Sequence, residues 1–412
     1  MDRVVVLHAA DLHLGGSVAV PDPAVARVAA GARAESLERM VALSAERGVG
    51  MVLLAGDVFD DPHPPLAARL ALEKALAAWR DMGARVFIAP GNHDPFTPDS
   101  VWAAWPEDPN LHIFTPEPRG VALGDAGLWV AGVAHAHDRV SRDLSAGLPG
   151  PPEGLTGLAV LHCALAAAGG AKRHEPYAPA ELSGLLAAPF AYWALGHVHR
   201  AQPAATAPLV VYAGTPQGAH WAEPGPRGVY LAKVSGASVT AEFHPLAPVV
   251  FQDLALDDLH QAATLSDLVQ RVRQAYHPAD GAWDFQRCLR LRLAGPCPLA
   301  RQLWDEDPGA LAETLKPELA AAGLVLELEG LYPALEPAEL AGRDDVLGRL
   351  LRLIDQAGED DELLVELGDK LARDLHPLNR GADPAERAAH LRGLLAAVRS
   401  LALRDLAGEA QP

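Results

Sequence analysis

The sequence predicts an α/β protein: a buried sheet flanked by helices, followed by a small α+β domain and a helical C-terminal region. Five continuous apolar runs in the first half are typical of strands covered on both faces. Segments with helical spacing of apolar residues separate the earliest of these runs, as in βαβ units. After about residue 245 the pattern changes to alternating strands and then to leucine-rich helices. We therefore predict three domains, at 1–245, 246–335 and 336–412.

The first elements alternate between strand and helix, because apolar runs and helical stripes follow one another. They are expected, in order, at 4–7, 24–47, 51–55, 65–81 and 86–89. Gly83 directly follows the second stripe and is expected to end that helix. The stretch 95–118, rich in proline and tryptophan, is expected to be a long surface loop with short helical pieces.

The later elements are mainly strands. Further strands are expected, in chain order, at 128–133, 158–161, 192–195, 209–213 and 228–234. No helical pattern separates the last two, so we expect this sheet to end in hairpins. In the second domain, strict alternation predicts strands with one open face at 288–293 and 324–329, joined by a helix over 300–322.

The C-terminal region has apolar stripes at helical spacing, at 347–354, 363–371 and 391–401. Amphipathic helices must bury their apolar face. These helices either fold back on the second domain or offer a groove to a partner helix. The sequence leaves both alternatives open.

Composition indicates a globular intracellular protein. Half of the 412 residues are hydrophobic, yet no apolar run approaches the roughly 20 residues that a membrane helix needs. The three cysteines (Cys163, Cys288 and Cys297) are odd in number and scattered, which is typical of a reducing compartment. We therefore expect a cytoplasmic protein without a membrane partner.

Polar residues follow each of the five apolar runs at 4–7, 51–55, 86–89, 158–161 and 192–195. They are Asp11, His13, Asp57, Asn92, His93, Asp94, His162, His197 and His199. Ligand sites in α/β sheets lie beyond the carboxyl ends of strands, so we expect these side chains to gather at one edge. Carboxylates, a carboxamide and imidazoles suit divalent first-row metals, with manganese, iron and zinc as alternatives.

So many ligands exceed what one ion needs, which predicts two ions about 3.5–4 Å apart that share a bridging carboxylate. Two such cations lower the pKa of a bound water and neutralise phosphate oxygens. Gly56, Gly91 and Gly196 are expected to let the backbone turn sharply beside the ions.

At these residues the sequence resembles the calcineurin-like metallophosphoesterase superfamily. That pattern is D-x-H, G-D, G-N-H-D/E, a lone His and G-H-x-H, and all five blocks are present. A closer resemblance, to SbcD-type nucleases and their YhaO-like branch, rests on residues 7–15, 56–60, 214–217 and 223–228. The resemblance covers about residues 1–250 and implies a two-sheet metallophosphoesterase sandwich flanked by helices. Beyond residue 250 it is only architectural, with a small α+β cap and then helices.

The resemblance also implies a role for each site residue. Asp11, His13 and His199 would hold a first metal, Asn92, His162 and His197 a second, and Asp57 would bridge them. His93 would point at the scissile phosphate, and Asp94 would orient or charge it. The implied ions are two Mn²⁺, with Mg²⁺, Fe²⁺ or Zn²⁺ as alternatives.

One position departs from the break-repair nucleases of archaea and eukaryotes, which carry a second active-site His where Asp60 stands. His63 either takes that place or is a surface-loop histidine. The balance between exonuclease and endonuclease activity therefore stays open.

The resemblance implies a DNA exonuclease or endonuclease of DNA repair. Its implied partners are DNA and a Rad50-like, SMC-type coiled-coil ATPase bound through the C-terminal helices, and a homodimer is left open. The alternative is a phosphoesterase that acts on a nucleotide, a cyclic nucleotide or a phosphoprotein. A scaffold that keeps metals only for structure is a third hypothesis, which the complete ligand set and His93 disfavour.

The net charge of −19 argues against unaided DNA binding, because that depends on cationic side chains that neutralise phosphates. Three explanations remain open: a local basic groove binds the DNA, a partner protein contributes much of the DNA binding, or the substrate is not a polymer.

Overall fold

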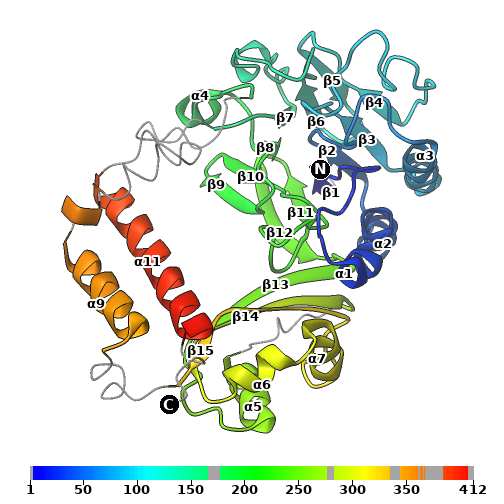
Figure 1. Ribbon diagram of the computed structural model, residues 1–412. Helices are drawn as coiled ribbons and strands as arrows, with labels where there is room; N and C mark the ends of the chain where they lie inside the picture. The colour runs from blue at the N-terminus through cyan, green and yellow to red at the C-terminus, as the bar shows by residue number, and fades with distance from the viewer. Residues whose placement is uncertain are drawn as a thin grey trace. The chain divides into compact units, whose positions relative to one another are not determined.

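The computed structural model describes residues 3–165, 177–275, 283–334, 344–360, 362–364, 366 and 384–406. The chain forms two compact units (Figure 1). The first comprises Met1–Phe251 and Ala279–Cys288, and the second Gln252–Pro278 and Leu289–Pro412. The domain boundaries expected near residues 245 and 335 stay predictions, and residues 335–343 lie outside the described part.

The first unit contains two six-stranded mixed sheets, which confirms the α/β sandwich. The first sheet has the order β12 (Ser238–Pro245), β11 (Gly228–Ser235), β1 (Val4–Ala9), β2 (Met51–Leu54), β3 (Arg85–Ile88) and β4 (Leu111–Ile113). The second has the order β5 (Arg119–Leu123), β6 (Leu128–Gly132), β7 (Thr156–His162), β8 (Tyr192–Gly196), β10 (Leu209–Tyr212) and β9 (Gln202–Thr206). Parallel strands form the centre of each sheet, and antiparallel strands lie at edges.

Central strands read as unbroken apolar runs because both of their faces are buried. Leu53 of β2 packs between the sheets, whereas its neighbours Val52 and Leu54 pack under the helices. Helices α2 (Ala32–Arg47) and α3 (Leu66–Asp81) pack on the outer face of the first sheet, and the shorter α1 (Pro23–Ala29) precedes α2 (Figure 1). A shorter helix, α4 (Leu182–Ala187), packs on the outer face of the second sheet.

Two predicted helices are each split in two. The helix expected over 24–47 is interrupted at Gly31, which has φ +81° and precedes α2. The helix expected over 300–322 is instead α6 (Ala300–Asp305) and α7 (Pro308–Leu315). Asp307 caps α7 by accepting a bond from the backbone N–H of Ala310 at 2.9 Å, and Pro308 occupies its first turn. These local signals override the apolar periodicity that runs across them.

A three-stranded sheet consists of β13 (Val249–Leu256), β14 (Gln286–Cys297) and β15 (Gly323–Pro333). The larger part of each strand belongs to the second unit. The alternation of β14 is confirmed. Leu289, Leu291 and Leu293 are buried in the apolar core of this unit. Arg290 and Arg292 both pair with the carboxylate of Asp253, at 2.5 and 3.1 Å.

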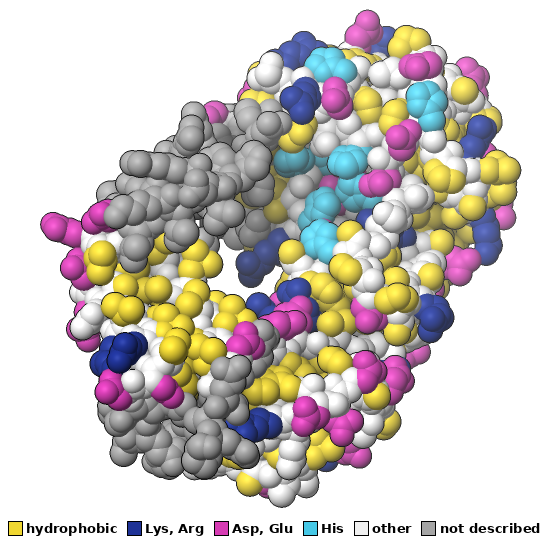
Figure 2. All heavy atoms as spheres, in the orientation of Figure 1, with side chains coloured by type: hydrophobic (Ala, Val, Ile, Leu, Met, Phe, Trp, Pro, Cys, Tyr) yellow, Lys and Arg dark blue, Asp and Glu magenta, His cyan; other side chains and the backbone are white. Residues whose placement is uncertain are grey.

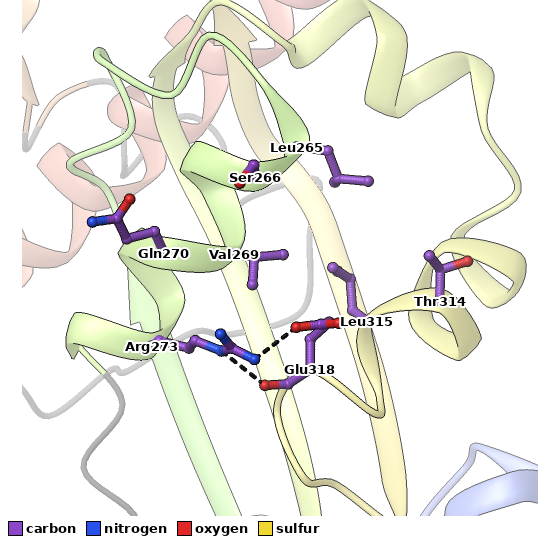
Figure 3. A pocket seen from close by; sticks show the side chains of 8 residues that line it. All are labelled: Leu265, Ser266, Val269, Gln270, Arg273, Thr314, Leu315 and Glu318. Carbon is purple, nitrogen blue, oxygen red and sulfur yellow. Dashed lines mark hydrogen bonds and ion pairs between the residues drawn. The ribbon is translucent and has the colours of Figure 1, made fainter.

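A cavity of about 520 Å³ lies between α5 (Leu265–Ala275) and the end of α7 (Figure 3). Leu265, Val269 and Leu315 supply its apolar wall. At one end, Arg273 donates to the carboxylate of Glu318 at 2.6 Å and to its backbone carbonyl at 3.0 Å. The ion pair ties α5 to the chain after α7.

Helices α9 (Val346–Glu359) and α11 (Pro384–Leu406) follow. Leu347 and Leu351 of α9 pack with Ala402 and Leu403 of α11, and Tyr332 of β15 packs against this cluster. Another stripe of α11 (Leu394, Val398 and Leu401) is exposed. The helical tail therefore folds back in part and also leaves an apolar stripe uncovered. Much of the middle stripe, 363–371, lies outside the described residues.

No helix in the described ranges combines the length and the apolar character that a membrane span requires.

One buried polar contact joins the two sheets. His8 of β1 is fully buried; its Nε2 donates to the carbonyl of Leu195 at 3.2 Å, and its Nδ1 accepts from the Tyr192 hydroxyl at 2.8 Å. This arrangement requires a neutral imidazole. Burial is the main cause that lowers the pKa of His8 to about 3, against a smaller opposing effect of the Leu195 carbonyl.

The lowered pKa of His8 makes the folded protein less stable as the pH falls. The unfolded chain takes up a proton at His8 near pH 6.5, whereas the folded chain does not until about pH 3, so stability is lost as the pH falls through this window. Between pH 7 and pH 5 the free energy of unfolding should fall by about 2 kcal/mol less in His8→Gln than in the wild type, because the variant lacks the titrating group. Urea unfolding of both proteins at both pH values measures it, and equal losses in the two proteins would contradict the prediction.

Candidate metal centre

The predicted site residues come from five loops on two sheets rather than from one sheet edge. The loop after β1 carries Asp11 and His13, the loop after β2 carries Asp57, and the loop after β3 carries residues 92–94. His162 is the last residue of β7, and His197 and His199 follow β8. The first two loops run side by side, because Asp11 N–H donates to Gly56 O at 3.0 Å and His13 N–H to Asp57 O at 2.9 Å. Figure 2 shows histidine side chains gathered on this face of the first unit.

Among the residues that the structure describes, three groups of His, Asp, Glu or Cys side chains have ligand atoms within 4.8 Å of one another. They are Asp11, His13 and His199; His13, Asp57 and His93; and Asp11, Asp57 and His162. Asp11, His13 and Asp57 each belong to two of these groups, so the three groups overlap in one site. Together they contain six of the nine predicted residues, and Asn92 joins them through its Oδ1, 2.9 Å from Nε2 of His162.

Lone pairs converge beside His162. Its Nδ1 lies 3.0 Å from the carbonyl of Ala55 and donates to it, so its Nε2 carries the lone pair. That Nε2 lies 2.9 Å from Oδ1 of Asn92 and 3.3 Å from Oδ2 of Asp57. Burial outweighs the attraction of Asp57 and lowers the pKa of His162 to about 3. A neutral imidazole and two oxygen acceptors repel one another unless a cation lies between them, so the donor set fits a metal.

A second convergence lies between His13 and His199. Their Nε2 atoms are 3.3 Å apart, whereas each Nδ1 faces a carboxylate, Asp60 at 2.9 Å and Glu223 at 2.5 Å. Burial alone would lower the pKa of His199, but the bond to Glu223 and the charge of Asp11 raise it to about 8. A proton or a metal ion is therefore stabilised between the two rings.

Asp57 lies between the two convergences. It is buried, its Oδ1 accepts the backbone N–H of His93 at 2.9 Å, and its Oδ2 lies 3.9 Å from Nε2 of His13. Burial raises the pKa of this carboxyl group. The charges of His162, His13 and His93 together outweigh burial and lower the pKa of Asp57 to about 2. Asp57 is therefore ionised at neutral pH and can face cations on both sides.

Backbone strain is concentrated at the site. In the described ranges, six non-glycine residues have φ between 43° and 96°, where side chains other than glycine are disfavoured. Four of them are Asp11 (53°), His13 (46°), Asp57 (49°) and His197 (96°). Such strain persists where the surrounding structure enforces it, commonly at functional sites.

The three site glycines allow close approach rather than only a turn, which corrects our expectation. Gly56 has φ +85°, whereas Gly91 and Gly196 do not have positive φ. A Cβ at Gly91 would lie 2.2 Å from Oδ1 of Asp57, and one at Gly196 would lie 1.8 Å from the carbonyl of Ala55. The backbone at these positions therefore packs directly against the ligands and their supports.

Gly91→Ala should weaken metal binding by at least 10-fold, because the new methyl group displaces Asp57, whose backbone N is also only 2.7 Å away. Titration calorimetry with Mn²⁺ measures the loss. Gly184→Ala is the matched control, since its Cβ would meet nothing within 4 Å. Equal affinities in the two variants would contradict the prediction.

Asp94 has a different environment from the one we expected. Its buried carboxylate accepts four backbone N–H bonds, from Gly91 (2.8 Å), Asp57 (3.2 Å), Val58 (2.9 Å) and Phe59 (3.1 Å). Burial, with Asp57 nearby, raises its pKa well above the usual range. Asp94 thus joins the loop after β2 to the loop after β3 through backbone amides of both.

The ring of His93 lies against Asp60 instead. Its Nδ1 is 3.3 Å from the carbonyl of Asp60 and 3.7 Å from the Asp60 carboxylate. The His93 side chain is 46% exposed, so its outer edge is accessible to a substrate.

His197 is in none of the three groups. Its backbone N–H donates to both carboxylate oxygens of Asp11, at 3.0 and 3.2 Å. Its ring centroid lies 5.3 Å from that of His162 and 5.5 Å from that of Tyr177. His63 is also apart from the groups; it is 62% exposed, with Asp61 and Asp99 at 3.8 and 3.7 Å.

Sequence reasoning missed three supporting residues. Asp60 and Glu223 face the rings of His13 and His199. Both lie in stretches on which the family resemblance rests, but the sequence did not predict that they support these histidines. His135 is buried, and its Nε2 donates to the carbonyl of His162 at 2.8 Å. It follows β6 closely, so the strand-end signal that indicated the other residues could have found it.

Comparisons with known proteins agree with this geometry. The profile of the calcineurin-like phosphoesterase family matches residues 4–201. The uncharacterized metallophosphoesterase YhaO of Bacillus subtilis is 30% identical over 319 residues, which cover 75% of this chain and 76% of that protein. A subunit of the nuclease SbcCD of the same organism is 27% identical over 258 residues, which cover 53% and 63%.

The crystal structure of TT1561 of Thermus thermophilus matches 59% of this chain and 99% of that one at 12% identity, with a TM-score of 0.35 that is too low to support an argument. The family profile and the match to YhaO over three quarters of both proteins are sufficient. The chain belongs to the calcineurin-like metallophosphoesterases, a family of phosphoester hydrolases whose fold binds two divalent metal ions.

Proposed function

We propose that this protein is a two-metal phosphodiesterase that cleaves DNA. The observation that carries the proposal is that metal-ligand atoms lie close together at two places, with ionised Asp57 between them. One place is at Nε2 of His162, and the other is between Nε2 of His13 and Nε2 of His199. In this assignment Asp11, His13 and His199 would hold one ion, Asn92, His162 and His197 would hold the other, and Asp57 would serve both. Mn²⁺ is the proposed ion, with Mg²⁺, Fe²⁺ and Zn²⁺ as alternatives.

Two such cations, when bound, neutralise phosphate oxygens and lower the pKa of a coordinated water. The protein's own contribution is to hold the metal ligands in place and to donate a proton to the leaving oxygen. His93 Nδ1 is held near the Asp60 carbonyl, which leaves Nε2 at the exposed edge of the ring. With Nδ1 held in this way, Nε2 is the ring nitrogen that can give a proton to the leaving oxygen.

DNA is the proposed substrate because a relative at 27% identity is named as a nuclease subunit. A coiled-coil ATPase of the SMC type is the proposed partner, and the exposed stripe of Leu394, Val398 and Leu401 on α11 is the proposed docking surface. Such a partner would contribute the cationic groups that bind DNA phosphates, which this chain with its net charge of −19 needs in order to act on DNA.

The net charge also favours a second candidate, a phosphoesterase for a small nucleotide or a cyclic nucleotide, because such a substrate needs no extended basic surface. A panel of single-stranded DNA, double-stranded DNA, bis-p-nitrophenyl phosphate and cyclic nucleotides, each with Mn²⁺, Mg²⁺ or Zn²⁺, separates the candidates. We expect hydrolysis of the model diester and of at least one DNA substrate with Mn²⁺. Hydrolysis of cyclic nucleotides alone would favour the second candidate. No hydrolysis of any diester would refute the first candidate and the cyclic-nucleotide form of the second.

A further inference from the structure

The two histidines assigned to the first metal have charged supports on both sides. Asp60 Oδ1 accepts from Nδ1 of His13 at 2.9 Å, and Glu223 Oε1 accepts from Nδ1 of His199 at 2.5 Å. The other side of each residue is held as well, because Arg33 donates to the carbonyl of His13 at 2.9 Å and Arg227 donates to the carbonyl of His199. Each histidine is therefore fixed at its ring and at its backbone.

His162, a ligand assigned to the second metal, is supported by neutral groups. Its Nδ1 donates to the backbone carbonyl of Ala55 at 3.0 Å, and its own backbone carbonyl accepts from Nε2 of buried His135 at 2.8 Å. Asn92 contributes a neutral carboxamide oxygen to the same position. A carboxylate that accepts from one imidazole nitrogen makes the other nitrogen a stronger donor than a neutral carbonyl does. The carboxylate supports of His13 and His199 thus differ from the neutral support of His162.

We propose that Asp60, Glu223, Arg33 and Arg227 are positioning residues that act on one metal position, and that this position binds its ion more tightly than the other. The proposal rests on the assignment of His13 and His199 to one ion, made above. It goes further in naming which residues make the two positions unequal.

Glu223 is the stronger support. Its side chain is 7% exposed and its second oxygen accepts the backbone N–H of Ala219 at 2.7 Å, so its orientation is fixed. In Glu223→Gln, one orientation of the amide turns its NH₂ group toward Nδ1 of His199, and the other turns it toward the N–H of Ala219. A donor faces a donor in both cases. The Asp60 side chain is 41% exposed, so solvent weakens its effect.

Mn²⁺ titration calorimetry of the full chain tests the proposal. The wild type should show two binding events of different affinity. Glu223→Gln should weaken the tighter event about 10- to 100-fold and leave the other within about 3-fold. Asp60→Asn should weaken the same event by a smaller factor. Asp258→Asn is the matched control, because Asp258 meets the imidazole of His260 at 2.7 Å far from the ligands in sequence, and both events should persist.

Equal weakening of both events by Glu223→Gln, or weakening of the looser event alone, would overturn this proposal and leave the proposed function intact. A wild type that binds fewer than two ions would overturn both. The melting temperature of each metal-free variant separates misfolding from a local effect. If Glu223→Gln does not fold, the more exposed Asp60→Asn decides, since unchanged binding in that variant would overturn the proposal.

Discussion

Asp57→Ala should abolish the binding of both metal ions and all phosphodiester hydrolysis. Oδ2 of Asp57 lies 3.9 Å from Nε2 of His13 and 3.3 Å from Nε2 of His162. Its buried carboxylate is ionised, because the charges of His162, His13 and His93 outweigh burial and lower its pKa to about 2. Removal of the carboxylate leaves His13 and His162 without the anion that offsets two adjacent cations. Calorimetry with Mn²⁺ should find no binding where the wild type binds two equivalents.

Asp57→Asn gives the same test with the shape of the side chain preserved. The amide oxygen can still accept the N–H of His93, so the fold should survive while the negative charge is lost. Asp61→Ala is the control, because that carboxylate is 65% exposed and is in none of the groups. Two equivalents bound by Asp57→Ala would show that Asp57 does not bridge the ions.

His93→Ala should keep both ions and slow the chemical step by about 10²- to 10⁴-fold, the usual contribution of a positioned acid. Its ring is 46% exposed, and Nδ1 is held by Asp60. The residue is also near His13 and Asp57, so a role as a ligand is the competing hypothesis. Single-turnover hydrolysis of bis-p-nitrophenyl phosphate, paired with calorimetry, distinguishes the two.

His63→Ala is the matched control, because it removes a second exposed imidazole that faces aspartates and is in none of the ligand groups. It should leave the rate unchanged. Loss of one equivalent of Mn²⁺ by His93→Ala would make His93 a ligand. A slower rate in His63→Ala would instead assign His63 the role of a second active-site histidine, which the resemblance to break-repair nucleases implies near Asp60.

Much of the fold was predictable from the sequence because the central strands are buried on both faces and therefore read as apolar runs. The strand ends then indicated the polar residues that the structure brings together. The short strand β4 (Leu111–Ile113) was missed because three residues carry no period. Gly31 and Pro308 were visible as helix breakers, but the apolar stripes that run across them masked the signal.

The supporting contacts of the site could not be predicted in the same way. Asp60 and His13 are 47 residues apart, and Glu223 and His199 are 24 apart, with no local pattern that pairs them. The role of Asp94 was misjudged for a related reason. Its neighbour in sequence is His93, but its partners in space are four backbone amides that only the folded loops bring within reach.

The origin of the ligands on two different sheets has a consequence for the stability of the whole first unit. Asp11 and His13 follow β1 of one sheet, whereas His162 and His199 follow β7 and β8 of the other, and the contact between His13 and His199 spans 186 residues. An ion that binds only when both sheets are in place shifts the folding equilibrium by mass action, by about 2.7 kcal/mol at 100 times its dissociation constant. With the proposed ligands, metal supply and folding would be thermodynamically linked, and a chelator would lower the stability of the first unit.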